Sequence, residues 1–134
     1  MEKDLIIKHV KVVFAELEDK GFGTSITIDV TDPALQEDIT KWVAEQNING
    51  GVAKFKDYTT KDGVATKQYN IKLSKFTDIK FKDEDMELGY GSVINVVVHP
   101  YEYDNKFGKG ISASASAIFV IKSKINTTMD KIAE

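Results

Sequence analysis

Hydrophobic and polar side chains alternate along much of the chain, and this pattern predicts β-strands. Residues 24–30 show it most plainly, since Ile26, Ile28 and Val30 alternate with Ser, Thr and Asp, the two-residue period of a half-buried strand. Residues 5–17 are rich in β-branched and aromatic side chains, which predicts an earlier strand. The chain therefore opens with two strands that follow one another closely.

A single helix is predicted after the second strand. Thr31 or Asp32 caps its N-terminus, and Pro33 takes the first helical position, where its missing N–H removes no hydrogen bond. Apolar side chains then recur with helical spacing and form one stripe: Leu35, Ile39, Trp42 and Val43. The stripe places Trp42 in the core, and the Asn-Gly-Gly sequence at residues 49–51 is expected to end the helix.

Two short strands are predicted next. Residues 52–58 and 64–73 carry strand-forming side chains, and the Lys-Asp-Gly sequence at residues 61–63 predicts a hairpin turn between them. Residues 76–88 are polar and rich in acidic side chains, which predicts a loop with a helical turn.

A long hairpin is predicted at the end of the chain. Residues 92–99 are rich in valine, and Pro100 fits only the end or the edge of a strand. After a turn at residues 104–108, Ile, Ala and Phe alternate with Ser over residues 111–121. The narrow face that these alanines form suits the inside of a small closed barrel.

The order of the elements predicts a mainly β fold. Two strands, one helix, a strand pair and a hairpin, with no β-α-β repeat, indicate an antiparallel barrel or sandwich. The simplest closure is a five-stranded antiparallel barrel of the oligonucleotide/oligosaccharide-binding (OB) type, with the helix between the second and third strands. We expect residues 1–134 to form one such domain, with residues 126–134 as a frayed helix or a tail.

The charge of the chain is unevenly distributed. All eighteen basic residues are lysine, and the formal net charge is −3. Residues 53–82 nevertheless hold eight lysines against three acidic residues. Lysine makes point-charge contacts with phosphate and reads bases poorly, so this basic block favours contact with a nucleic-acid backbone; a solvated charged surface explains it equally well. The chain has no cysteine and a short, charged N-terminal segment, which predicts a cytoplasmic protein without a membrane span.

The sequence predicts no enzyme, no cofactor and no metal site. His9 and His99 lie in strands without the spacing of metal ligands, and the serines near Ser114 lack a neighbouring base. The acidic residues 83–87 could collect Mg²⁺ in a hydrolase or nuclease, but they lack the fixed spacing of a calcium loop. A solvated acidic loop is the simpler interpretation.

Aromatic side chains and lysines occur together in two clusters. This combination suits a single-strand binder, because bases stack on flat rings while cations follow the phosphates, each stacked base being worth about 1–3 kcal/mol. The first cluster comprises Lys54, Phe55, Lys56, Tyr58, Lys67, Tyr69 and Lys72. The second, at the hairpin turn, comprises Tyr101, Tyr103, Lys106, Phe107 and Lys109. Phe55 and Tyr58 fall on opposite faces of a regular strand, and Tyr69 suits the core as well as a binding surface.

The C-terminal third resembles bacteriophage single-stranded DNA-binding proteins, which have an OB fold. The resemblance covers residues 89–120 and is carried by Gly91-Ser92-Val93, Tyr101, an Asn-Lys-Phe-Gly turn and Lys109-Gly110-Ile111. It implies binding of single-stranded DNA with little sequence preference, in phage replication or recombination, often as a dimer and in the bacterial host cytoplasm. The implied binding residues are those of the hairpin turn together with lysines of the basic block.

Two points qualify what the resemblance implies. Many members end in an acidic tail that recruits replication proteins of phage or host, whereas this chain ends Asp130-Lys131-Ile132-Ala133-Glu134. Recruitment through the tail is therefore in doubt. The alternative function is a phage protein-interaction module that binds a host protein through the same barrel surface, with the hairpin rings as its central contacts.

Overall fold

A computed structural model describes residues 3–18 and 23–124. The predicted tail at residues 126–134 lies outside the described residues. The elements, in chain order, are β1 (Leu5–Glu16), β2 (Ser25–Asp29), α1 (Pro33–Glu45), the 3₁₀ turn η1 (Ile48–Gly50), β3 (Lys56–Thr59), β4 (Ala65–Lys72), β5 (Asp78–Phe81), β6 (Val93–Asn105) and β7 (Gly108–Lys122).

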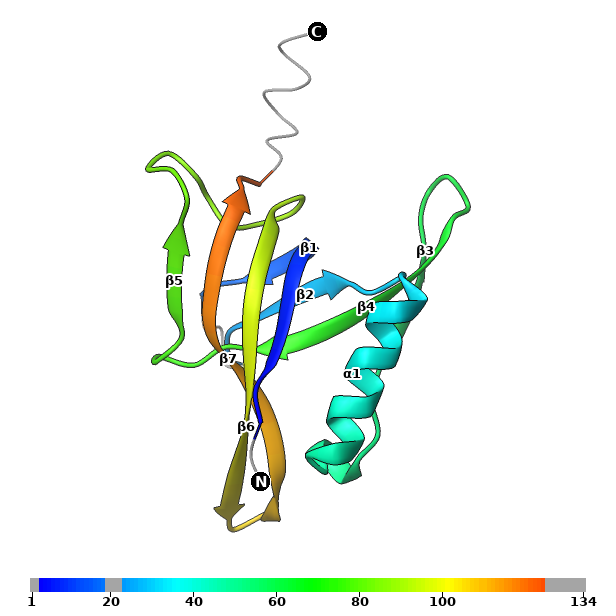
Figure 1. Ribbon diagram of the computed structural model, residues 1–134, viewed down its shortest axis with the longest axis vertical. Helices are drawn as coiled ribbons and strands as arrows, with labels where there is room; N and C mark the ends of the chain where they lie inside the picture. The colour runs from blue at the N-terminus through cyan, green and yellow to red at the C-terminus, as the bar shows by residue number, and fades with distance from the viewer. Residues whose placement is uncertain (1–2, 19–22, 125–134) are drawn as a thin grey trace, which may run out of the picture.

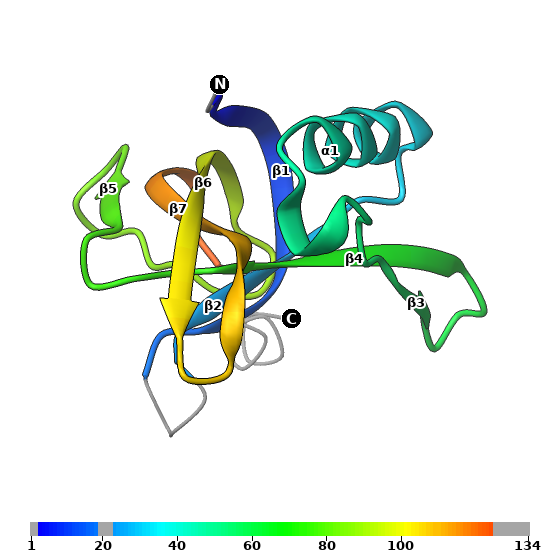
Figure 2. The same cartoon turned by 90° about the horizontal axis from the view of Figure 1, so that it is seen from below.

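The strands described form one sheet that closes on itself. Its order is β3-β4-β2-β1-β6-β7-β5, and an additional pairing joins β4 to β7. The five strands β1, β2, β4, β7 and β6 therefore make a closed ring (Figures 1 and 2), while β3 and β5 extend it as outer strands. The pairs around the ring are antiparallel except the closing pair, Lys72 beside Ser114, which is parallel. The predicted mainly β, OB-type barrel with a helix after its second strand is confirmed.

Alternation along the strands builds the core. Ile26, Ile28 and Val30 point inward and are fully buried, as the two-residue period predicts. Helix α1 lies against the barrel (Figure 2) and adds Ile39, Trp42 and Val43 to the same cluster. The prediction that Trp42 belongs to the core is confirmed.

The ends of α1 follow local chemistry. The Asp32 carboxylate accepts a hydrogen bond from the Ala34 N–H at 3.0 Å, and Pro33 is the first helical residue. The predicted N-terminus is therefore confirmed. The helix ends at Glu45, earlier than the glycines at residues 50–51 predicted, because Asn47 already adopts a left-handed conformation with φ of 54°.

Residues 76–88 were expected to form a loop, and that expectation is wrong in part. Asp78–Phe81 forms β5, which pairs in parallel with β7. A four-residue outer strand has too few alternating positions to stand out from a polar segment, since its pairing depends on a partner about forty residues later in the chain.

The expected single inner face along β7 is wrong beyond Ala115. Val97 pairs with Ala117, whereas its neighbour Val98 pairs with Ala115, so Ser116 is the extra residue of a β-bulge. The bulge reverses the faces: Ile118 is buried, while Phe119 is turned outward.

The hairpin is longer than predicted. β6 continues to Asn105 and β7 starts at Gly108, so the turn holds only Lys106 and Phe107. The last β1–β6 pair is Leu5 with Val98, so at Pro100 strand β6 no longer has β1 as a neighbour. The missing N–H of Pro100 therefore disrupts no β1–β6 hydrogen bond. The paired strands project beyond the barrel (Figure 1).

Candidate nucleic-acid interface

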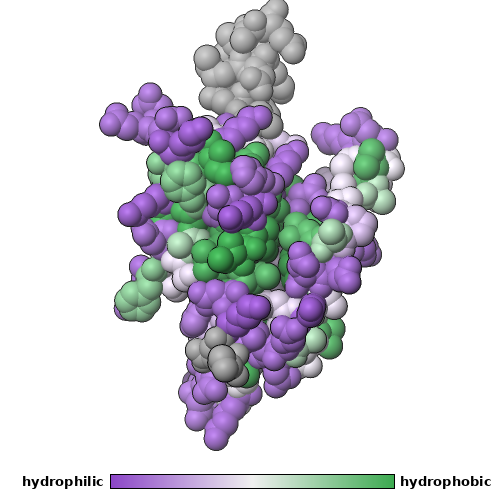
Figure 3. Space-filling view, in the orientation of Figure 1, coloured by the Kyte–Doolittle hydropathy of each residue, from purple (hydrophilic) through white to green (hydrophobic). Residues whose placement is uncertain are grey.

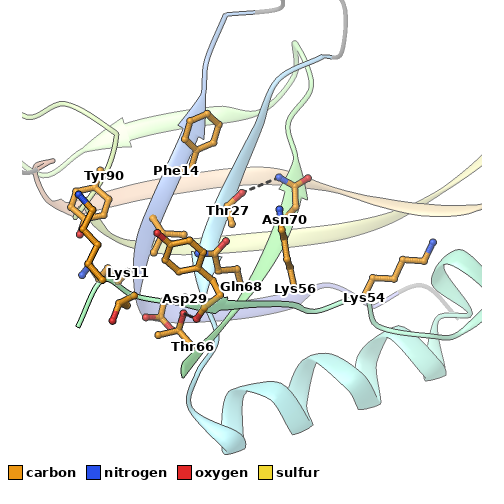
Figure 4. A pocket seen from close by; sticks show the side chains of 14 residues that line it. Lys11, Phe14, Thr27, Asp29, Lys54, Lys56, Thr66, Gln68, Asn70 and Tyr90 are labelled. Atoms are coloured by element: carbon orange, nitrogen blue, oxygen red, sulfur yellow. Dashed lines mark hydrogen bonds between the residues drawn. The ribbon is translucent and has the colours of Figure 1, made fainter. Parts of the chain in front are cut away.

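A groove of about 870 Å³ runs across the outer face of the barrel (Figure 4). It crosses β1, β2, β4 and β3, and the loop residue Tyr90 lies at one end of it. Its lining residues are Lys11, Val13, Phe14, Thr27, Asp29, Lys54, Lys56, Tyr58, Thr60, Lys61, Thr66, Gln68, Asn70 and Tyr90.

The floor of the groove is formed by the polar side chains that point outward from the alternating strands. Because Ile26 and Ile28 point into the core, Thr27 points outward. Thr27 pairs with Asn70 on β4, and the Asn70 amide donates to the Thr27 hydroxyl at 3.1 Å. The same amide also donates to the Ser25 hydroxyl at 3.1 Å. These bonds fix the position of the Asn70 amide on the polar floor of the groove.

Three aromatic side chains of the described residues line the groove beside this floor, and each is about half exposed. Phe14, Tyr58 and Tyr90 expose 56%, 50% and 51% of their surfaces. Phe14 faces outward because a bulge in β1 shifts the register after Val12, which brings it beside Thr27. Lys11 Nζ lies 5.4 Å from the centroid of the Tyr90 ring, a cation–π distance. Exposed rings of this kind are flat platforms on which bases stack.

The groove is positively charged although the whole chain is negative. Among the described residues that line it, Lys11, Lys54, Lys56 and Lys61 face one carboxylate, Asp29. That carboxylate already accepts hydrogen bonds from the Thr31 N–H at 2.9 Å and the Thr31 hydroxyl at 2.6 Å. The groove therefore combines an excess of cations with stacking surfaces.

The residues of the first predicted cluster are divided between several places. Lys54, Lys56 and Tyr58 line the groove. Phe55 and Tyr69 pack together instead, with ring centroids 5.7 Å apart, against the core. Phe55, which precedes β3, thus faces the core while Tyr58 faces the groove, and the prediction that the two point to opposite sides is confirmed. Burial raises the pKa of Tyr69.

The two remaining lysines of this cluster lie outside the groove. Lys67 Nζ forms an ion pair with Asp57 at 2.8 Å. Lys72 lines a second, smaller pocket, which also includes Lys54 and Tyr69.

The second predicted cluster forms a separate surface at the hairpin tip. Tyr101, Tyr103 and Phe107 are exposed, and Phe107 exposes 87% of its surface with Lys106 Nζ 5.1 Å from its ring centroid. The Tyr103 ring covers Gly110 so closely that a Cβ there would lie 2.5 Å from the tyrosine oxygen. The tip residues, Lys109 included, line neither the groove nor the second pocket.

Sequence reasoning missed Phe14, Tyr90 and Lys11. Regular alternation gave no reason to turn Phe14 outward, because the bulge that does so depends on β2. Tyr90 lies between Gly89 and Gly91 in a connection. An isolated aromatic residue between two glycines was the available signal that this ring lies on the surface.

The described part of the chain has neither a cluster of metal ligands nor a membrane-spanning helix. No three of its His, Asp and Glu side chains are grouped to hold a metal ion. None of its helices has the length and apolar character needed to cross a membrane.

Comparisons with known proteins identify the fold. No protein-family model and no curated protein sequence matches the chain. Among solved structures, the single-stranded DNA-binding protein of bacteriophage Enc34 in complex with single-stranded DNA matches with a TM-score of 0.60 and 18% identity, over 91% of this chain and 88% of that chain.

Two other matches are structures of phage proteins. A second structure of the Enc34 protein matches with a TM-score of 0.60 and 19% identity, over 96% of this chain and 89% of that chain. The single-stranded DNA-binding protein gp2.5 of bacteriophage T7 gives a TM-score of 0.47 at 13% identity, over 94% of this chain and 90% of that chain. Together with the closed barrel, the Enc34 matches show that this chain has the fold of a phage single-stranded DNA-binding protein.

Proposed function

We propose that the protein binds single-stranded DNA, without catalysis and with little sequence preference, along the groove over β1, β2, β4 and β3. The observation that carries this proposal is that, within the described part of the chain, three half-exposed rings and four lysines line one groove. Its fold likeness to the Enc34 protein, which has been solved with single-stranded DNA, supports the choice of ligand.

The chemistry of the groove favours single strands over duplexes. Stacking on Phe14, Tyr58 and Tyr90 requires bases that are not held in the base-paired stack of a duplex, and such stacking is worth about 1–3 kcal/mol for each base. Lysines contact phosphates without reading bases, which explains the low sequence preference. We propose that the hairpin tip is a secondary contact for longer strands, and that the protein serves phage DNA replication or recombination.

Fluorescence anisotropy with a labelled oligo-dT and with a duplex of equal length tests this function. The single strand is expected to bind more tightly, and Tyr58→Ala and Phe14→Ala are each expected to weaken it by about 1–3 kcal/mol. Phe76→Ala is the matched control, because Phe76 is strongly exposed but lines neither the groove nor the second pocket. Equal affinity for both forms of DNA, or equal losses in all three variants, would contradict the proposal.

A second candidate function, a protein-interaction module, is favoured by an apolar patch away from the groove. Figure 3 shows hydrophobic side chains gathered in the middle of the face over β6 and its neighbours. On the outward side of these strands Ile6 pairs with Val97, which pairs with Ala117. Exposed apolar patches often mark protein partners. This function predicts no affinity for oligonucleotides, so the same titration separates the two.

A further inference from the structure

A second pocket, of about 310 Å³, lies in the barrel wall where β4 and β7 separate. In the described residues these two strands pair only at Lys72 and Ser114. The pocket has an apolar floor, which includes Ile48 of η1, Ile71 and Val98. Its volume is at the lower end of the range for small-molecule pockets, about 300–1,000 Å³, so it suits one flat ring system.

The polar groups of this pocket are few and are placed at its rim. Lys54 and Lys72 are the charged side chains that line it among the described residues, and no carboxylate faces them. Tyr69 and Ser112 add hydroxyl groups. The pocket therefore matches a ligand with apolar faces, polar edges and an adjacent negative charge.

Ser112 provides a polar contact for a ligand in this pocket. The residue is only 8% exposed, and within the described ranges its hydroxyl has no hydrogen-bond partner. Every fully enclosed side-chain polar atom of the described residues has a hydrogen-bond partner. The Ser112 hydroxyl has none among these residues, so it is not fully enclosed and is open to the pocket that Ser112 lines. A nearly buried hydroxyl without a partner is unfavourable, and a bound polar group would satisfy it.

The second pocket adjoins the groove. Lys54 and Asn70 line both. A strand that lies in the groove therefore passes the mouth of the pocket, and Lys54 stands at the junction. A base turned out of the strand at this point is therefore next to the pocket.

We propose that the pocket between β4 and β7 takes one base turned out of the strand bound in the groove. The base lies against Ile48 and Ile71, its edge bonds to the Ser112 hydroxyl, and Lys72 contacts the phosphate beside it. This inference rests on the proposed function, because it needs a strand in the groove. It adds a subsite that holds one base of the strand apart from the stacked bases.

A scan with abasic sites tests the inference. An oligo-dT of the minimum length that binds with full affinity fixes the register, and one abasic residue is placed at each position in turn. At one position, away from the stacked bases, removal of the base is expected to lower affinity at least fivefold in the wild type. In Ser112→Val, which adds an apolar group at the pocket wall and removes the hydroxyl, the intact oligomer is expected to bind at least fivefold more weakly, and that position is expected to lose its effect.

The controls separate the pocket from the fold and from the groove. Ser116→Val makes the same change on an exposed part of β7, outside both pockets, and is expected to bind like the wild type. Ser112→Ala, which adds no volume, replaces Ser112→Val if that variant does not fold, and is then expected to lower affinity and reduce the effect of the same position. Wild-type affinity in both Ser112 variants, with the position-dependent loss retained, overturns the inference and leaves the proposed function intact. No binding by the wild type overturns both.

Discussion

Replacing Lys54 and Lys56 with glutamine tests whether the groove contacts phosphates. These are two of the four lysines that line the groove among the described residues. For single strands the logarithm of affinity falls with the logarithm of salt with a slope of about −0.7 for each neutralised phosphate. Four lysine–phosphate contacts therefore give a slope of about −2.8, and the double variant is expected to have a slope smaller in magnitude by about 1.4.

The difference is large enough to measure. A fourfold rise in salt lowers the affinity about fiftyfold at a slope of about −2.8, but only about sevenfold at about −1.4. The assay is an anisotropy titration of labelled oligo-dT at several salt concentrations. Lys75→Gln with Lys82→Gln is the matched control, since both lysines are exposed and line neither pocket. The reasoning is refuted if the groove variant keeps the wild-type slope, or if the control pair reduces it as much.

Three further changes test other parts of the structure. Asp32→Ala removes the N-cap of α1 and is expected to lower the free energy of unfolding by about 1 kcal/mol in urea titrations; an unchanged midpoint contradicts the capping role. Burial raises the pKa of Tyr69, so ionisation is easier in the unfolded chain, and stability is expected to fall as the pH rises above about 10. Tyr69→Phe is expected to lessen this fall in stability. An equally steep decline in that variant contradicts the role of Tyr69 ionisation. Combined replacement of Tyr101, Tyr103 and Phe107 by alanine is expected to weaken binding of long oligomers while sparing short ones in anisotropy titrations; equal affinity for long oligomers removes the tip from the interface.

The parts of the fold that depend on local patterns could be predicted from the sequence. The alternation of Ile26 and Ile28 with Thr27 identified both the core face and the polar face of β2, because side-chain direction in a strand follows from position alone. The start of α1 at Pro33 followed from the capping chemistry of Asp32.

The features that depend on a distant partner could not be predicted. The bulges near Val13 and at Ser116 arise from the register between two strands, and each reverses which side chains face outward. For this reason Phe14 was missed as a groove residue. Lys54, Lys56 and Tyr58 were found because the charge and ring pattern of their segment is local, whereas the separation of the hairpin tip from the groove is a property of the folded barrel.

The seam between β4 and β7 has a consequence for local stability. In the described chain this seam is closed by Lys72 and Ser114 alone, while β1 and β2 pair at four positions. Transient opening there breaks few hydrogen bonds and requires much less free energy than global unfolding. A ligand that bridges both strands binds only the closed ring, and so suppresses the opening by mass action. Amide hydrogen exchange at residues 72 and 114 is therefore expected to slow when a ligand bridges β4 and β7. This measurement does not depend on the aromatic side chains of the groove.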